Sequence, residues 1–276
     1  MISGYQAVYD QDFPDAIRYA GDNEFEYVSF DLNVPRFYID HLSDVELAKI
    51  RSQAESMGVG LAFHAPGDNI SLYTDYPPIR RGIIEHFSSI IRAAGKLDAR
   101  HVTIHAGICP SLRQVHRKQD DFAEDHRDYF RAVLYDNISC LAEQVQSVLL
   151  CIENCNFTRL TMDTVEKLLS DNERLALTWD IAKTYDRELR RDEDVEDFMW
   201  KHCDRIREVH AHDIIKGGRS HQVVGEGGLE FVRYAPVLLR PDVAVTFEVR
   251  PREAALKSRR LMLCMLDQKP VTAESD

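Results

Sequence analysis

The sequence lacks several features that define other classes of protein. No apolar run approaches the ~20 residues that a membrane-spanning helix needs, and the N-terminal residues show no basic stretch followed by an apolar core. The six cysteines form no CxxC pair and no regular framework. We therefore expect a cytoplasmic protein with reduced thiols and no membrane partner.

Positive charge is also scarce. The chain has 34 Lys and Arg residues against 46 Asp and Glu residues, which gives a net charge of −12. Proteins that bind nucleic acid usually present a basic face, because the release of counterions drives their affinity. We expect a small-molecule partner and no nucleic-acid partner.

Glycine-rich phosphate loops are missing as well, since neither GxGxxG nor GxxxxGK[ST] occurs. This argues against an open doubly wound sheet. Instead, eight apolar strand-like runs alternate with segments of helical spacing, which predicts a (β/α)8 TIM barrel, an α/β fold, as a single domain over residues 1–268 with a flexible tail at 269–276. The strand-like runs are Ile2–Val8, Tyr27–Asp31, Val59–His64, His101–His105, Val148–Glu153, Leu175–Asp180, Ile206–His210 and Val243–Glu248.

The last four strand-like runs each end in an acidic or imidazole side chain. These side chains are Glu153, Asp180, His210 and Glu248. Such a group at the mouth of an apolar strand is costly to desolvate without a partner. Four in series predict a divalent metal site at the open end of the barrel, whereas a structural ion-pair network is the simpler alternative. The oxygen-rich set suits Mn²⁺ first, then Mg²⁺ or Co²⁺, with Zn²⁺ also open.

Two earlier runs end in histidine, namely His64 and His105. With Glu153 as a bridge, these rings could hold a second metal ion. Alternatively they contact substrate hydroxyls or are polar caps of barrel strands.

An ordered series of fragments resembles the xylose-isomerase-like TIM barrels, a superfamily of sugar isomerases, ketose epimerases, inosose-metabolising enzymes and endonuclease IV. The fragments are Phe63-His64-Ala65-Pro66, Ile104-His105-Ala106-Gly107, Ile152-Glu153-Asn154, Trp179-Asp180, Val209-His210-Ala211-His212-Asp213, Val224-Gly225-Glu226-Gly227 and Thr246-Phe247-Glu248-Val249. The resemblance implies that Glu153, Asp180, His210 and Glu248 ligate a metal at the carboxyl-terminal mouth. It also implies a homo-oligomer, because related barrels often pair.

The sequence departs from the endonuclease IV pattern at the ligands of a third metal. Lys183 stands three residues after Asp180, where those relatives carry a histidine, and Arg219 replaces an aspartate, so only His221 remains. A trinuclear phosphodiesterase site is therefore not expected.

Two functions remain open. The first is a metal-dependent isomerase or epimerase of a sugar, sugar phosphate or polyol ketone, in which Glu153 and Glu248 transfer the proton. The second is an endonuclease IV-like metallohydrolase or phosphoesterase with a dinuclear site. A non-catalytic barrel would leave the ligand residues idle. The residues that we expect to contact substrate are Lys183, His212, His221, Glu226 and Arg250.

Overall fold

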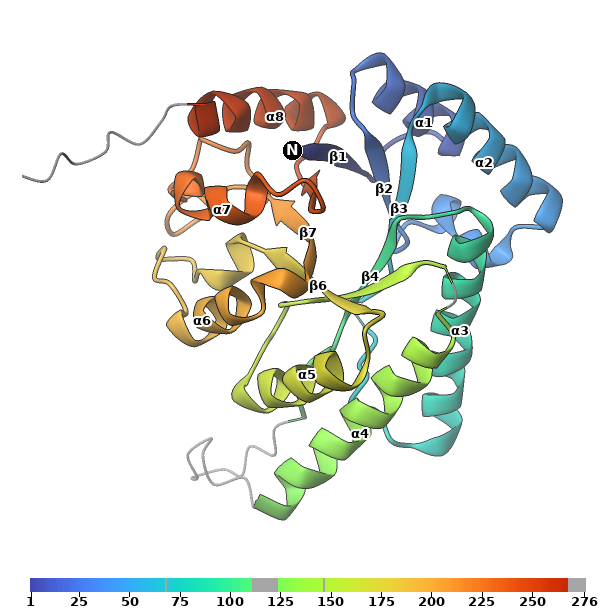
Figure 1. Ribbon diagram of the computed structural model, residues 1–276, viewed down its shortest axis with the longest axis vertical. Coiled ribbons are helices and arrows are strands. Elements are labelled where there is room, and N and C mark those ends of the chain that lie inside the picture. Colours follow the sequence, from blue (N-terminus) through green and yellow to red (C-terminus); the bar gives the residue numbers. More distant parts are fainter. Residues whose placement is uncertain (68, 111–123, 146, 268–276) are drawn as a thin grey trace, which may run out of the picture.

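In the computed structural model, a closed barrel of eight parallel strands runs in the order of the sequence, and helices surround it (Figure 1). The structure describes residues 1–67, 69–110, 124–145 and 147–267. The predicted tail at 269–276 lies outside the described residues. The strands are β1 (Ile2–Ala7), β2 (Tyr27–Asp31), β3 (Gly60–His64), β4 (His101–His105), β5 (Leu149–Glu153), β6 (Leu175–Asp180), β7 (Ile206–Ala211) and β8 (Ala244–Phe247). The predicted TIM barrel is confirmed.

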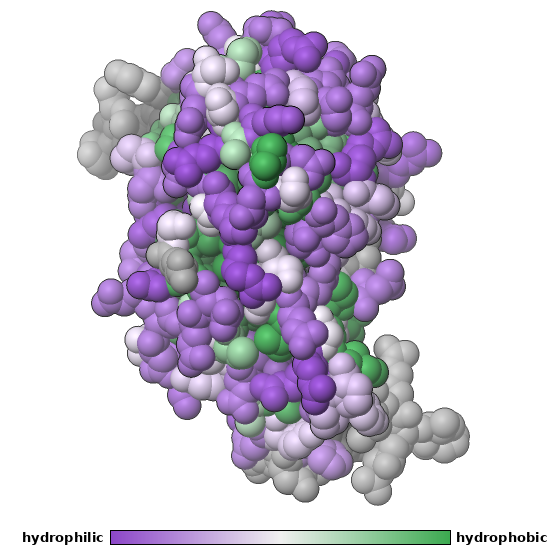
Figure 2. All heavy atoms as spheres, turned by 90° about the vertical axis from the view of Figure 1, so that its right-hand side faces the viewer, coloured by the Kyte–Doolittle hydropathy of each residue, from purple (hydrophilic) through white to green (hydrophobic). Residues whose placement is uncertain are grey.

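The helices alternate with the strands, as the sequence spacing predicted. They are α1 (Phe13–Asp22), α2 (Asp44–Met57), α3 (Pro77–Lys96), α4 (Glu124–Glu143), α5 (Arg159–Asp171), α6 (Glu193–Lys201), α7 (Ala235–Leu238) and α8 (Arg252–Asp267). Figure 2 shows the side of the barrel that lies at the right in Figure 1. Hydrophilic residues cover most of this side, and hydrophobic residues appear there in small separate areas. On this side, the apolar side chains of the helices therefore pack mainly toward the strands.

Capping explains where α2 begins and ends. The Ser43 side chain accepts a hydrogen bond from the Glu46 backbone N–H, and the Glu46 carboxylate accepts one from the Ser43 N–H in return. Gly58 ends the helix in the left-handed conformation, with φ of 67°.

The connection between β7 and β8 differs from the regular pattern. It contains a short 3-10 helix, Phe231–Tyr234, followed by the four-residue α7. The loop that precedes them contains Gly225, Gly227 and Gly228, which disfavour a longer helix. Residues 212–230 therefore form an irregular loop that follows β7 at the barrel mouth.

The barrel interior holds an ionisable group below the mouth. Glu208 of β7 is fully buried, and its carboxylate accepts hydrogen bonds from the hydroxyls of Thr103 (2.5 Å), Thr178 (3.0 Å) and Thr246 (2.5 Å). These threonines lie on β4, β6 and β8, the alternate strands that form one interior layer of such a barrel. Three hydroxyl donors offset much of the cost of burying this carboxylate.

Candidate metal centre

The register of the sheet brings the predicted strand-end residues to one height. His105 is paired with Glu153 across β4 and β5, and Asp180 is paired with His210 across β6 and β7. Glu248 directly follows β8, and its backbone N–H donates to the Ala211 carbonyl (3.2 Å). Parallel strands end at the same edge of a sheet, so these side chains gather at the carboxyl-terminal mouth.

One carboxylate oxygen of Glu153 lies at the centre of the group. Glu153 Oε2 is 3.0 Å from His64 Nε2, 3.0 Å from His105 Nε2 and 3.4 Å from His210 Nδ1. The Glu153 side chain is only 2% exposed. Three imidazole rings from β3, β4 and β7 therefore converge on one buried carboxylate.

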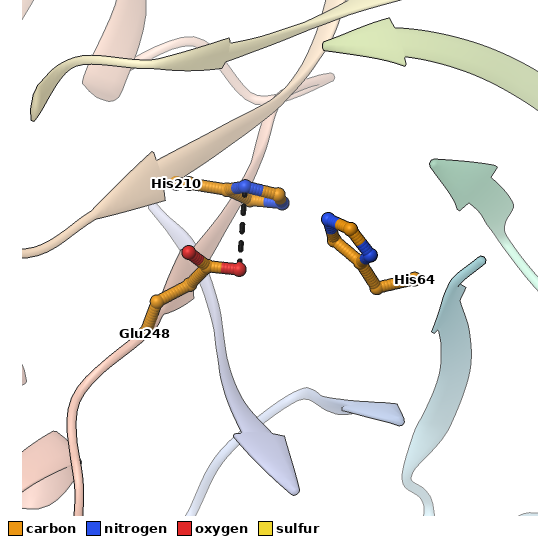
Figure 3. A group of neighbouring side chains, drawn as sticks. All are labelled: His64, His210 and Glu248. Carbon is orange, nitrogen blue, oxygen red and sulfur yellow. Dashed lines mark ion pairs between the residues drawn. The ribbon is translucent and has the colours of Figure 1, made fainter. Parts of the chain in front are cut away.

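His210 lies between two carboxylates at the mouth and a third one below. Its Nδ1 is 3.4 Å from Glu153 Oε2 and 3.4 Å from Glu248 Oε1, and the second contact is drawn in Figure 3, where the His64 ring faces the same space. Its Nε2 is 3.1 Å from Glu208 Oε2. Both ring nitrogens are buried, yet neither has a hydrogen-bond partner of good geometry among the described residues.

Asp180 is fully buried and held by the backbone. Its Oδ1 accepts hydrogen bonds from the N–H groups of Ala182 (2.9 Å) and Lys183 (3.2 Å), and its Oδ2 is 3.4 Å from His212 Nε2. Burial alone would raise the pKa of Asp180, but the nearby His212 ring outweighs burial and lowers the pKa to about 2. Asp180 is therefore an ionised oxygen donor at neutral pH.

The histidines and Glu153 shift each other's pKa values. Burial alone would raise the pKa of Glu153, yet the His105 and His210 rings hold it well below the usual range of a carboxyl group. Burial would lower the pKa of His105, but the charge of Glu153 is the main cause that raises it to about 10. The group therefore holds ionised carboxylates beside imidazoles that readily bear positive charge.

This donor set fits a divalent cation. The ligand atoms of Glu153, Asp180 and His210 lie within 4.8 Å of one another, as do those of His64, His105 and Glu153. A third grouping joins His64, His210 and Glu248 (Figure 3). The unpartnered nitrogen His210 Nδ1 points between two carboxylates, which is the arrangement that a cation would complete. The structure thus brings together all six residues that the sequence singled out as candidate ligands.

His212 and His221 stack on one another beside this group, with ring centroids 4.1 Å apart. His212 Nδ1 accepts a hydrogen bond from the His221 backbone N–H (3.0 Å), so its proton lies on Nε2, facing Asp180. His221 Nδ1 is 2.9 Å from the Glu248 carbonyl oxygen. Although His212, His221 and Glu248 also form a grouping of metal-binding size, the nitrogens of His212 already have partners.

The other residues expected to contact substrate lie at different distances from the centre. Arg250 donates to Gln6 Oε1 (2.7 Å), and Gln6 in turn donates to Glu248 Oε1 (2.7 Å), so Arg250 is linked to the centre through one side chain. Lys183 is an exposed residue on the rim, one turn beyond Asp180. Glu226 forms an ion pair with Lys257 of α8, and the structure does not bring it to the cluster.

Two residues that contact the cluster were missed at the level of the sequence. Gln6 is the penultimate residue of β1 and carries no charge, and Glu208 lies inside β7 and not at its end, so neither fits the pattern of charged strand ends. The available signal for Glu208 was its spacing, because residues two apart on a strand share a face and Glu208 precedes His210 by two.

Asp213 organises the loop that follows β7. Its carboxylate accepts hydrogen bonds from the backbone N–H groups of Ile214 (2.8 Å), Gly225 (2.9 Å), Gly227 (3.0 Å) and Leu229 (3.0 Å). A Cβ atom at Gly227 would lie 2.3 Å from Asp213 Oδ1, so only glycine permits this approach. The Gly225-Glu226-Gly227 segment is thus fixed by Asp213.

Comparisons with known proteins agree with this architecture. A family model described as the xylose isomerase-like TIM barrel matches residues 17–264, so the chain belongs to that family. The uncharacterized protein MJ1311 of Methanocaldococcus jannaschii is 24% identical over 237 residues, which cover 80% of this chain and 75% of that protein.

Solved structures with the same fold include proteins of different activities. A D-tagatose 3-epimerase-like protein matches with a TM-score of 0.76 and 18% identity over 97% of each chain. Endonuclease IV from Thermus thermophilus matches with a TM-score of 0.70 and 16% identity, covering 97% of this chain and 99% of that one. At this level of identity the likeness establishes the fold and leaves the activity open.

Proposed function

We propose that the protein is a divalent-metal-dependent isomerase or epimerase of a hydroxy-carbonyl compound of the sugar type. The observation that carries this proposal is the position of Glu153 and Glu248, whose carboxylates each lie 3.4 Å from His210 Nδ1. Proton abstraction next to a carbonyl and return of the proton need one carboxylate base and one carboxylic acid close to the same carbon.

In this proposal, Glu153, Asp180, His210 and Glu248 would hold the ion. When bound, a divalent ion supplies Lewis-acid polarisation of a carbonyl group. Because Glu153 has a pKa well below the usual range, it is ionised at neutral pH. It would accept the proton from the carbon next to the carbonyl, which leaves an enediolate. Glu248 would pass a proton from solvent to that enediolate, and Glu153 would release its proton to solvent, so the net charge and the atoms of the substrate are conserved.

The environment of the two glutamates supports a water-poor reaction site. Glu153 is 2% exposed and Glu248 is 5% exposed. Gln6 donates a hydrogen bond to Glu248 Oε1 and so fixes the orientation of this carboxylate. Electrostatic interactions in such a site are stronger than in water. Mn²⁺ is our first expectation for the ion, with Zn²⁺, Co²⁺ or Mg²⁺ as alternatives.

A phosphoesterase of the endonuclease IV type is the second candidate. It is favoured by one observation, namely that His64 and His105 each lie 3.0 Å from Glu153 Oε2. These three residues would hold a second ion, bridged to the first by Glu153, as a dinuclear hydrolase requires.

The two candidates are separated by metal content and by substrate. We would measure metal ions per chain by elemental analysis on protein purified without chelator. In parallel we would follow exchange of solvent deuterium into ketoses, ketose phosphates and keto-sugar acids by NMR, and hydrolysis of a nitrophenyl phosphodiester and of abasic DNA. About one ion per chain with deuterium exchange supports the isomerase, whereas two ions with phosphodiester hydrolysis supports the phosphoesterase.

Variants test whether the assigned carboxylates carry the activity. Glu153→Gln and Glu248→Gln should each lower deuterium exchange by about 10²-fold or more, and Glu153→Gln should also lower the metal content. Glu173→Gln is the matched control, because Glu173 is exposed and makes no ion pair within the described residues. Full metal occupancy and full exchange in both site variants would refute the proposed function.

A further inference from the structure

A pocket of about 720 Å³ opens beside the candidate metal centre, between the loops that follow β5, β6 and β7. Its lining includes Asn154, Lys183, Arg187, His212 and Arg219. The pocket borders the centre through one shared side chain, because His212 lines it and also faces Asp180 Oδ2 at 3.4 Å. A group bound in this pocket would therefore lie next to the candidate metal centre.

Three cationic side chains line the pocket. Lys183, Arg187 and Arg219 are exposed, and none of them makes a salt bridge in the part of the chain that the structure describes. The lining also has two acidic residues. Asp186 pairs with Arg190 (2.7 Å), and Asp192 keeps its charge while it accepts a hydrogen bond from the Val195 N–H at the start of α6. Three cations thus stand against one carboxylate without a salt bridge among the described residues, and the net charge of the lining is positive.

The backbone fixes two of these cations on one rim. The Gly217 N–H donates to the Arg187 carbonyl (2.6 Å), which joins the loop after β6 to the loop after β7. The Ile215 N–H donates to the Arg219 carbonyl (3.1 Å) and closes the turn that presents Arg219. The Lys183 N–H donates to Asp180 Oδ1 (3.2 Å), which holds the Lys183 backbone next to the candidate centre.

The charge of this pocket is opposite to that of its surroundings. The protein has a net charge of −12, and the adjacent centre holds Glu153, Asp180 and Glu248. An anionic substrate would be repelled by that background unless local cations compensate. Unpaired arginine and lysine side chains are the groups that bind phosphate and carboxylate most strongly.

We propose that the substrate carries an anionic group, a phosphate or a carboxylate, that Lys183, Arg187 and Arg219 bind in this pocket while the hydroxy-carbonyl end reaches the metal centre. This inference rests on the proposed isomerase function for the role of the second end. It narrows the substrate class from neutral sugars to sugar phosphates or sugar acids.

The test is a calorimetric titration of the metal-loaded protein with inorganic phosphate and, separately, with malonate. We would compare the wild type with Lys183→Gln, Arg187→Gln and Arg219→Gln. Lys216→Gln is the matched control, because Lys216 is exposed on the same loop as Arg219 and is not part of the lining. Each lining variant should weaken binding of the preferred anion by about tenfold, and the control should bind like the wild type. The tighter of the two probes identifies the group as phosphate or carboxylate.

Equal affinity in all variants would place the anion elsewhere, for instance on the metal, and would overturn the inference. Deuterium exchange separates this failure from failure of the proposed function. Suppose that neutral ketoses exchange as fast as their phosphates and acids, and that the variants bind both probes normally. This result would support the isomerase function and refute the anion site. If no hydroxy-carbonyl compound exchanges but the lining variants still lose anion binding, the result would support the anion site and refute the isomerase function.

Discussion

The carboxylate of Glu208 lies directly below the candidate centre and faces the side of His210 that points away from the mouth. Glu208 Oε2 lies 3.1 Å from Nε2, and its negative charge favours the proton of a neutral imidazole on that nitrogen, which leaves the Nδ1 lone pair toward the mouth. Carboxylates that hold the far nitrogen of a ligand histidine commonly strengthen metal binding. Glu208 is therefore a positioning residue, because it acts through His210.

Replacing this carboxylate tests that role. Glu208→Gln keeps the size of the side chain but removes the charge below His210, so metal affinity should fall by about 10- to 100-fold. Co²⁺ titration followed by visible absorption measures the affinity, and circular dichroism verifies the fold. Glu196→Gln is the matched control, since Glu196 is similarly buried but pairs with Arg233 on the outside of the barrel. Unchanged Co²⁺ affinity in Glu208→Gln would exclude the positioning role.

The raised pKa of His105 makes a prediction for the metal-free protein. Its folded-state pKa of about 10 lies above the ordinary value near 6.5 because of Glu153. The resulting stabilisation is fully present below about pH 6.5 and is lost as the pH rises through 10. In chelator, the free energy of unfolding should fall by about 1–3 kcal/mol between pH 7 and pH 10.

Urea denaturation at a series of pH values measures this slope. Glu153→Gln is the informative comparison, because it removes the charge that raises the His105 pKa and should flatten the slope. Bound metal should do the same, since a ligand histidine is neutral. Stability that stays constant or increases over this range in metal-free wild-type protein would contradict the assignment.

Among the elements, the beginning of α2 shows how far local sequence signals extend. Ser43, Glu46 and Gly58 define both ends of this helix, through the capping box and the left-handed end. These signals act over three or four residues and need no knowledge of the rest of the chain. The strand-like runs likewise agree with β1 to β8 to within one residue at each end.

The cap can be removed without affecting the candidate centre. Ser43→Ala should lower the free energy of unfolding by about 1 kcal/mol, because the N-terminal N–H groups of α2 lose their acceptor. Ser52→Ala on the exposed face of the same helix should be neutral or slightly stabilising. Urea denaturation compares the two, and metal affinity should be the same in both. A loss in Ser52→Ala as large as that in Ser43→Ala would contradict the capping argument.

Side chains that meet across several elements were beyond sequence reasoning. The contacts of Glu208 with Thr103, Thr178 and Thr246 depend on which residues face inward on four strands, and the register of β6 and β7 shifts between Leu177 and Thr178. A shift of one residue reverses the faces of a strand. The grouping of Lys183, Arg187 and Arg219 depends similarly on the paths of two loops. In contrast, the strand-end residues were predictable, because parallel strands of a closed barrel end at one edge.

At the scale of the whole molecule, the candidate ligands connect elements that are far apart in the sequence. His64, His105, Glu153, Asp180 and His210 come from β3 to β7, and Glu248 follows β8. An ion bound by several of these ligands would link the strand ends at the barrel mouth. It would therefore bind the folded chain far more tightly than the unfolded chain. Binding should therefore stabilise the barrel by about 2.7 kcal/mol when the free ion is at about 100 times its Kd.

Thermal unfolding with and without chelator measures this coupling. For a protein of this size the stabilisation corresponds to a rise in Tm of about 5–10 °C, with the largest rise from the ion that the centre prefers. Asp180→Asn should reduce the rise, because it removes an ionised oxygen donor from the mouth. Ser43→Ala should lower the Tm in chelator yet retain the full rise, because α2 contributes no ligand. A rise of equal size in wild type and Asp180→Asn would mean that the stabilising ion binds without Asp180. If no divalent ion changes the Tm, the converging carboxylates and imidazoles are not a metal site. They would then be a structural ion-pair network that stabilises the strand ends without an ion.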